Sequence, residues 1–256
     1  MIIAFIPCRL QSSRFPNKAL KLINGVASIE RCLLNACAIP GIDKIILATT
    51  TNKEDDILET YNLNDLVEVI RGDENDVLQR FLPSIKKYKP EHVIRITGDC
   101  PLVSPELGKI IINSHLDSGA DVSYTLSKVA LGISFEIIKV QAIEKLLSLF
   151  NKTEHSEYLI YYFVNNPEYF SLNNIKAPEK FIRQWRLTLD EENDLELLNL
   201  IYKTLDVGMK PVLFEEVISY FDKYPDSALI NLGNEVKYRD NKALVELLKK
   251  ATTISK

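Results

Sequence analysis

Cysteine is scarce in this chain, and the patterns that would give it a structural or metal-binding role are missing. The 256 residues include four cysteines, at positions 8, 32, 37 and 100, and none of them form a Cys-x-x-Cys pair. Cys/His ligand spacing is absent too, which disfavours a zinc site. A chain of this length needs no disulfides to stabilise its core. We therefore expect reduced thiols and a cytoplasmic protein.

Excess positive charge and long apolar runs are also lacking. The chain has 31 Lys and Arg against 35 Asp and Glu, a net charge of −4. This balance disfavours a broad basic face for nucleic acid or an anionic membrane. No uncharged stretch is long enough to span a bilayer, and the apolar N-terminus meets Pro7 and Arg9 too early for a signal peptide. We expect no nucleic acid and no membrane partner, and phosphate binding confined to a small site.

The sequence does contain short apolar runs that alternate with longer amphipathic stretches. Runs rich in β-branched residues predict strands over Ile2–Pro7, Lys44–Ala48, Val67–Ile70, His92–Thr97, Asp121–Tyr124, Ser134–Ile138, Phe170–Ile175 and Trp185–Leu189. Helices are predicted over 26–38, 53–61, 75–88, 105–118, 139–150, 155–165 and 191–205. The alternation predicts an α/β fold with a mainly parallel sheet flanked by helices, and chemistry at the strand carboxyl ends.

The last part of the chain has a different pattern. Helical stretches near 214–222 and 241–250 are joined by turn-prone segments at 224–227 and 231–234. We interpret residues 1–210 as the main domain and 211–256 as a C-terminal helical appendage packed on it.

A loop with three cations and two hydroxyls follows the first strand. The cations are Arg9, Arg14 and Lys18, and the hydroxyls belong to Ser12 and Ser13. Such donors can neutralise the oxygens of a polyphosphate. The loop has no glycine between positions 8 and 18, so it is neither a Walker loop nor a dinucleotide fingerprint. A merely solvated basic loop is the alternative that these residues alone leave open.

Five ordered motifs give the chain a family resemblance. IPCRLQSSRFPNK at 6–18 resembles the signature of the cytidylyltransferases that activate 3-deoxy sugar acids, and more particularly their SpsF-like branch. The likeness extends through ATTTN at 48–52, VIRGDENDVL at 69–78, TGDCPL at 97–102 and LTLD at 187–190, and covers roughly residues 1–205. The resemblance implies a Rossmann-like nucleotidyltransferase fold of the GT-A type.

The resemblance also assigns roles to the first loop and to the base pocket. It implies that Arg9, Arg14 and Lys18 act on the triphosphate as catalytic phosphate ligands, with Ser12 or Ser13 as a hydroxyl donor. Arg71 matches the position that reads the base, where a guanidinium can donate to the O2 and N3 acceptors of cytosine. The alternative for Arg71 is an exposed side chain that pairs with a neighbouring acid. Cys8 stands where the family usually has alanine, and we interpret it as a pocket wall.

Two aspartates are implied to hold the metal. Asp99 follows the strand that ends in TGD, and a carboxylate there can combine with phosphate oxygens around Mg²⁺. Asp190 is the second implied metal ligand, although its position before a helix also suits a simple N-cap. Asp194 matches a further family acid, and we expect it to orient a neighbour from within the helix.

The acceptor side is implied more loosely. Glu136 and His155 fall where the family places residues near the sugar, and Arg183 and Arg186 could meet a sugar carboxylate. Buried His and strand-end Arg are also common structural residues, so both readings stay open for these four positions.

The expected function is therefore a nucleotidyltransferase that makes a nucleotide-activated sugar from CTP and a sugar acid with Mg²⁺, releasing pyrophosphate, for surface polysaccharide or glycan synthesis. A guanylyltransferase acting on a sugar phosphate is one alternative. A Mg²⁺-dependent glycosyltransferase is another, but it typically carries an Asp-x-Asp pair where this chain has Gly98-Asp99-Cys100. A homodimer is plausible by resemblance.

Overall fold

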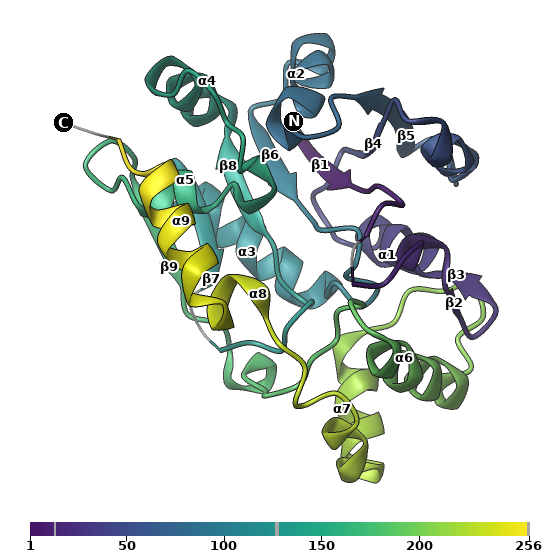
Figure 1. Ribbon diagram of the computed structural model, residues 1–256. Helices are drawn as coiled ribbons and strands as arrows, with labels where there is room; N and C mark the ends of the chain where they lie inside the picture. Colours follow the sequence, from purple (N-terminus) through teal and green to yellow (C-terminus); the bar gives the residue numbers. More distant parts are fainter. Residues whose placement is uncertain (13, 126–127, 255–256) are drawn as a thin grey trace.

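A seven-stranded sheet organises the computed structural model, which describes residues 1–12, 14–125 and 128–254 (Figure 1). Its strand order is β5 (Val67–Gly72), β4 (Lys44–Thr50), β1 (Ile2–Pro7), β6 (His92–Arg95), β8 (Glu136–Lys139), β7 (Val122–Thr125) and β9 (Leu172–Ile175). The first four are parallel, β8 is antiparallel to β6 and β7, and β7 is parallel to β9. The predicted α/β architecture with a mainly parallel sheet is confirmed.

Helices cover both faces of this sheet. The residues of one buried cluster come partly from α1 (Ser28–Cys37), α3 (Pro105–Ser118), α6 (Glu192–Leu205) and α7 (Phe214–Lys223). The other cluster draws on α2 (Val77–Tyr88), α4 (Val140–Leu149) and α5 (Tyr161–Val164). Strand β1 feeds both, because alternate side chains of a strand point to opposite faces. Phe5 stacks on Phe81 of α2, whereas Ala4 and Ile6 face the α1 side.

The segment after residue 210 packs against helices that flank the sheet. Helix α7 contacts α6, and α9 (Lys242–Thr252) contacts α5 after the short α8 (Lys237–Asp240). The Asn35 side chain in α1 holds this segment through the backbone of Val212, at 2.9 and 3.0 Å. A small hairpin of β2 (Leu22–Ile23) and β3 (Val26–Ala27) precedes α1.

Three predicted elements differ in type from the observed ones. Trp185–Leu189 is not a strand of the sheet: Leu187 N–H donates to Leu131 C=O at 2.8 Å, and Trp185 stacks on Phe221 of α7. The segment therefore pairs with a loop and not with a strand of the sheet, and its Trp185 side chain packs against α7. The helix predicted over 155–165 is split into a 3-10 turn, Ser156–Tyr158, and the short α5, and the one predicted over 53–61 is a 3-10 helix, Lys53–Thr60.

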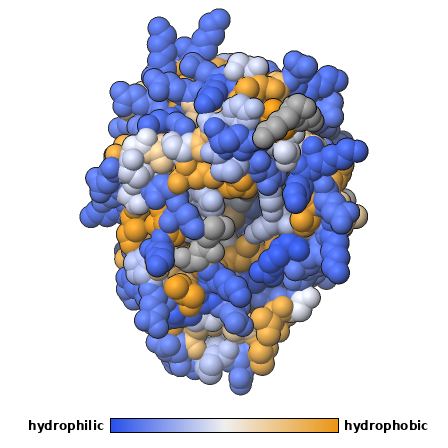
Figure 2. All heavy atoms as spheres, turned by 90° about the vertical axis from the view of Figure 1, so that its left-hand side faces the viewer, coloured by the Kyte–Doolittle hydropathy of each residue, from blue (hydrophilic) through white to orange (hydrophobic). Residues whose placement is uncertain are grey.

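The molecular surface carries scattered apolar side chains. Figure 2 shows a largely hydrophilic face with small, separated hydrophobic areas. No helix in the described part of the chain has the length and apolar character required to cross a membrane.

Two histidines, the buried His115 of α3 and the half-buried His92 of β6, contact each other beside β7. His115 has no exposed surface, and its two ring nitrogens contact His92 Nδ1 at 3.0 Å and Ser123 Oγ at 2.7 Å. The pKa of His115 is lowered from 6.5 to about 4, mainly by burial and then by the nearby charges of His92 and Lys139, against the opposing effect of Asp121. The imidazole is therefore neutral in the folded protein at neutral pH.

Acidification is expected to destabilise the protein through this histidine. The unfolded state binds a proton near pH 6.5 but the folded state only near pH 4, so stability is complete above pH 6.5 and falls as pH drops toward 4. The loss over that window is about 3 kcal/mol. Urea unfolding at pH 7, 5.5 and 4 measures it. If His115→Gln shows the same dependence as the wild type, His115 is not its source.

Candidate active site

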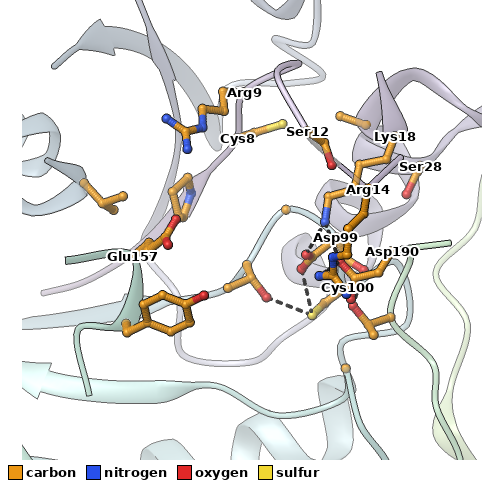
Figure 3. A pocket seen from close by; sticks show the side chains of 18 of the residues that line it. Cys8, Arg9, Ser12, Arg14, Lys18, Ser28, Asp99, Cys100, Glu157 and Asp190 are labelled. Atoms are coloured by element: carbon orange, nitrogen blue, oxygen red, sulfur yellow. Dashed lines mark hydrogen bonds and ion pairs between the residues drawn. The ribbon is translucent and has the colours of Figure 1, made fainter. Parts of the chain in front are cut away.

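The cavity of interest lies at the carboxyl ends of β1 and β6 and has a volume of about 450 Å³ (Figure 3). Its walls come from several regions of the chain, which include the loop after β1, the start of α1, the segment before α2, the end of β6 through Cys100, the segment around 186–190 and the C-terminal segment near residue 236. Gly98 lets the chain after β6 approach the end of β1, because a Cβ at this position would stand 3.1 Å from Pro7 O and 3.2 Å from Cys8 Cβ.

Hydrogen bonds to a buried side chain and within the backbone hold the loop after β1 in shape. Leu10 N–H donates to buried Asp55 at 2.8 Å, and Asn17 N–H donates to Leu10 C=O at 3.2 Å. Asn17 adopts the left-handed conformation, with φ of 56°, which turns the chain into the 3-10 helix that begins at Lys18. The loop thereby brings Arg9, Arg14 and Lys18 to one cavity.

Lys18 joins the two predicted carboxylates. Its Nζ lies 2.6 Å from Asp99 Oδ2 and 2.8 Å from Asp190 Oδ1, and Arg14 also donates to Asp190 Oδ1 at 2.8 Å. The backbone fixes this proximity, because Leu189 N–H and the Thr188 hydroxyl donate to the Asp99 carbonyl at 2.8 and 3.1 Å. Three distant segments therefore converge on one charge cluster.

The ion pairs of this cluster decide its protonation states. Burial acts to raise the pKa of Asp99, but the charge and hydrogen bond of Lys18 outweigh it and hold that pKa below its usual value. Burial likewise acts to lower the pKa of Lys18, and the charges of Asp99 and Asp190 raise it overall. At neutral pH Asp99 is therefore a carboxylate and Lys18 an ammonium.

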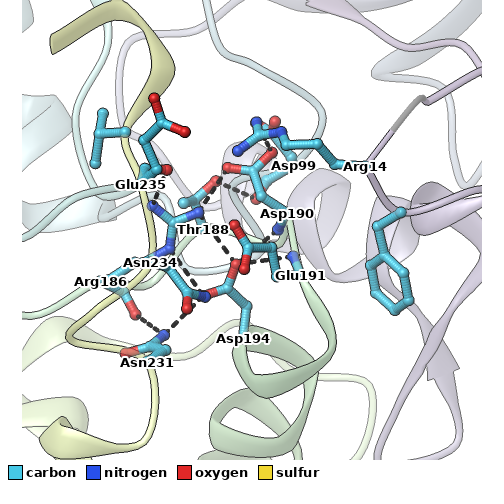
Figure 4. A network of polar contacts seen from close by, with 12 residues as sticks. Arg14, Asp99, Arg186, Thr188, Asp190, Glu191, Asp194, Asn231, Asn234 and Glu235 are labelled. Carbon is cyan, nitrogen blue, oxygen red and sulfur yellow. Dashed lines mark hydrogen bonds and ion pairs between the residues drawn. The ribbon is translucent and has the colours of Figure 1, made fainter. Parts of the chain in front are cut away.

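A buried network orients Asp190 from the other side (Figure 4). Arg186 donates to Asp190 Oδ2 at 3.0 Å and to Asp194 Oδ1 at 2.8 Å. Asp194 accepts from the backbone N–H groups of Asp190 and Glu191 at 2.9 and 3.0 Å, and so fixes the start of α6. Asn231 also donates to Asp194, at 2.9 Å. Asp194 thus positions a neighbour.

The sequence predictions separate into two groups by location. The residues that line the cavity are Arg9, Ser12, Arg14, Lys18, Asp99, Arg186 and Asp190. Four predicted residues do not line it in the described part of the chain: Arg71, Glu136, His155 and Arg183. Ser13 lies outside the described residues.

The four residues away from the cavity have other contacts. Arg71 forms ion pairs with Asp56 and Glu59 at 2.6 and 2.9 Å on the outer side of β5. Glu136 is buried in an ion pair with Arg95, and Arg183 lies over Trp185 and donates to nearby backbone carbonyls. His155 precedes the 3-10 turn Ser156–Tyr158.

Sequence reasoning missed several lining residues. Arg80 is buried and donates to the backbone carbonyls of Ala48, Asp73 and Glu74, so it shapes the loop before α2. Its only signal was a position two residues beyond a matched motif. Val236 and Tyr238 reach the cavity from the C-terminal appendage, where no motif pointed to them.

Cysteine chemistry does not fit the cavity. Burial raises the pKa of Cys8 to about 12, with the nearby charge of Lys18 opposing it, and burial also raises the pKa of Cys100. Both thiols are therefore protonated at neutral pH and poor nucleophiles. Cys8 lines the cavity wall, where the sequence analysis placed it.

Asp99 and Asp190 supply oxygen donors that suit a divalent cation. No group of three or more His, Cys, Asp or Glu side chains in the described ranges could hold a metal alone. Asp99 and Asp190 nevertheless both reach one point, the position of Lys18 Nζ, within 2.8 Å. Mg²⁺ usually takes one or two carboxylates and completes its shell with phosphate oxygens and water. The two aspartates fit that requirement.

A mainly parallel sheet with a cation-rich loop after its first strand and two aspartates that meet a cation of that loop has the arrangement of a nucleotidyltransferase type of α/β enzyme. A family model described as Cytidylyltransferase matches residues 3–226. The spore coat polysaccharide biosynthesis protein SpsF of Bacillus subtilis (strain 168) is 32% identical over 236 residues, 89% of this chain and 96% of SpsF. The chain belongs to the cytidylyltransferase family and is a nucleotidyltransferase, which confirms the resemblance in its motifs.

Solved structures share the fold. A cytidylyltransferase from Leptospira borgpetersenii serovar Hardjo-bovis (strain JB197) has a TM-score of 0.79 and 22% identity, covering 92% of this chain and 97% of that one. The CMP:2-keto-3-deoxy-manno-octonic acid synthetase complexed with CTP has a TM-score of 0.59 and 16% identity, covering 79% and 98%. These likenesses confirm the predicted nucleotidyltransferase fold.

Proposed function

We propose that this enzyme transfers the cytidylyl group of CTP to a hydroxyl of a sugar acid, in the cytoplasm, to supply an activated sugar for surface polysaccharide. The observation that carries this proposal is the cluster of Lys18, Asp99 and Asp190 inside a cavity lined by two further loop cations, Arg9 and Arg14. SpsF, a relative across nearly the whole chain, is named for spore coat polysaccharide biosynthesis. The free cysteines suit a reducing compartment.

The residues of the cavity divide the work of in-line transfer. Arg9, Arg14, Lys18 and the Ser12 hydroxyl would bind the triphosphate and neutralise its charge. Asp99 and Asp190 would hold Mg²⁺, which when bound supplies a positive charge that polarises the phosphoryl oxygens. The sugar hydroxyl oxygen forms a bond to the α-phosphorus, the bond to the β-phosphate oxygen breaks, and the hydroxyl proton passes to solvent. Positioning provides most of the rate.

Further residues would contact the base and the acceptor sugar. Because Arg71 is paired with Asp56 and Glu59, its reading of cytosine would need that pair to open. Cys8, Glu74 and Arg80 line the cavity and would instead contact the base. The sugar would enter beside Tyr158 and Tyr238, which also line the cavity. We also propose a homodimer, which light scattering in solution would test.

Nucleotide selectivity is expected to distinguish the candidate functions. With Mg²⁺ present, CTP at a hundred times its Kd should stabilise the protein by about 2.7 kcal/mol and raise Tm by about 5–10 °C, because it binds only the folded state. GTP, UTP and ATP should give smaller shifts, and pyrophosphate release should require a sugar acid. A GTP-selective shift would favour the guanylyltransferase, and a shift with nucleotide sugars alone would favour the glycosyltransferase.

A further inference from the structure

Ser28 is a buried hydroxyl with no hydrogen-bond partner in the described part of the chain. Three buried side-chain atoms share that property, the others being Thr49 Oγ1 and Asn231 Oδ1. Ser28 has no exposed surface, and of these three residues it alone lines the active-site cavity. A buried hydroxyl without a partner costs free energy, so its persistence at a cavity wall points to a ligand.

The backbone around Ser28 adds further donors. Ser28 is the first residue of α1, a helix of ten residues, and the preceding Ala27 provides no side-chain cap. The first N–H groups of a helix lack partners within it, and its N-terminus carries a partial positive charge. The Ser28 N–H itself donates to Lys21 C=O at 2.9 Å, so the donors for a ligand are the hydroxyl and the N–H groups that follow. The acid of the first turn, Glu30, does not line the cavity. Hydroxyl and helix end therefore favour an anion.

Neighbouring charges favour the same class of ligand. Lys18 lies beside Ser28 on the same wall in Figure 3. The carboxylates of this region, Asp99 and Asp190, are both occupied by Lys18, and Asp190 also by Arg14. Neither carboxylate accepts a hydrogen bond from the Ser28 hydroxyl, which has no partner among the described residues.

We infer that Ser28 and the N-terminus of α1 form the subsite for the pyrophosphate that leaves CTP. The inference rests on the proposed function. When the bond from the α-phosphorus to the bridging oxygen breaks, its electron pair stays on the pyrophosphate, and the Ser28 hydroxyl donates to an oxygen of that leaving group. Because Ser28 has no exposed surface, side chains of the cavity wall must shift to admit the anion.

Ser28→Ala should separate ligand binding from stability. Removing an unpartnered hydroxyl relieves the ligand-free protein, so its Tm should rise by roughly 2–4 °C. The Kd for inorganic pyrophosphate with Mg²⁺, measured by calorimetry, should rise about tenfold, because the hydrogen bond to the anion is lost. The Kd for CMP should stay within twofold, since CMP lacks the leaving group.

Thr49→Val is the matched control, because Thr49 is equally buried and unpartnered but lies in β4 away from the cavity wall. It should raise Tm and leave both ligands unchanged. Unaltered pyrophosphate binding in Ser28→Ala, or equal losses for pyrophosphate and CMP, overturns the subsite. Should that variant not fold, Ser28→Cys, a weak donor of similar size, takes its place with the same expected outcomes. A wild type that binds CMP but not pyrophosphate overturns the subsite alone, and one that binds neither overturns the proposed function too.

Discussion

Asp99→Asn is expected to lower kcat for pyrophosphate release by about 10³-fold, or about 4 kcal/mol. Asparagine keeps the shape of the side chain but replaces a charged oxygen ligand with a neutral amide. The fold should survive, because Lys18 keeps its contact with Asp190 at 2.8 Å and the Asp99 carbonyl keeps its backbone bond to Leu189. Initial rates with CTP, Mg²⁺ and a sugar acid measure the first effect, and thermal unfolding measures the second.

The control for this variant is Asp226→Asn, which changes an exposed carboxylate outside the cavity and should leave kcat unchanged. Activity of Asp99→Asn within tenfold of the wild type would show that this carboxylate does not hold the cation. A large loss of Tm in the same variant would show that Asp99 acts through the fold.

Asp194→Ala is expected to reduce the free energy of unfolding by about 3–5 kcal/mol, because it leaves Arg186 with less compensation in a buried site. Burial acts to lower the pKa of Arg186, and its hydrogen bond and ion pair with Asp194 raise it overall. The variant also removes the acceptor for the N–H groups of Asp190 and Glu191. Urea unfolding measures the loss.

Two further variants test the reasoning behind that number. Asp194→Asn retains one oxygen acceptor for the start of α6 and should fall between the wild type and Asp194→Ala. Glu154→Ala removes an exposed partner of Lys152, 3.4 Å away, and should cost less than about 1 kcal/mol. A loss below that value in Asp194→Ala would mean that the buried network contributes little to stability.

Much of the architecture could be predicted from hydrophobic periodicity. The first strand, Ile2–Pro7, and the helix at 105–118 have the predicted bounds, because each pattern is long and has clear boundaries. The segment Trp185–Leu189 has a strand-like pattern, yet it pairs with a loop and packs on α7. Periodicity reports which side chains are buried, and it does not report what buries them.

The loop cations and the acids could be identified from the sequence because they stand in contiguous motifs next to strand ends. Their partners could not. Arg71 lies near the end of β5, but acids of a neighbouring 3-10 helix hold its guanidinium outside the cavity. Tyr238 enters the cavity wall from a segment beyond residue 226, where the family match ends.

The sequence by itself determined the α/β class, the family and the charged residues at the strand ends, because these depend on local periodicity and on short motifs. The tertiary structure decided which of these residues meet. Lys18 contacts carboxylates 81 and 172 positions away, and the hydroxyl of Ser28 faces the cavity without a partner. Such contacts depend on how the helices pack on the sheet and where its loops converge, and no local pattern encodes that geometry.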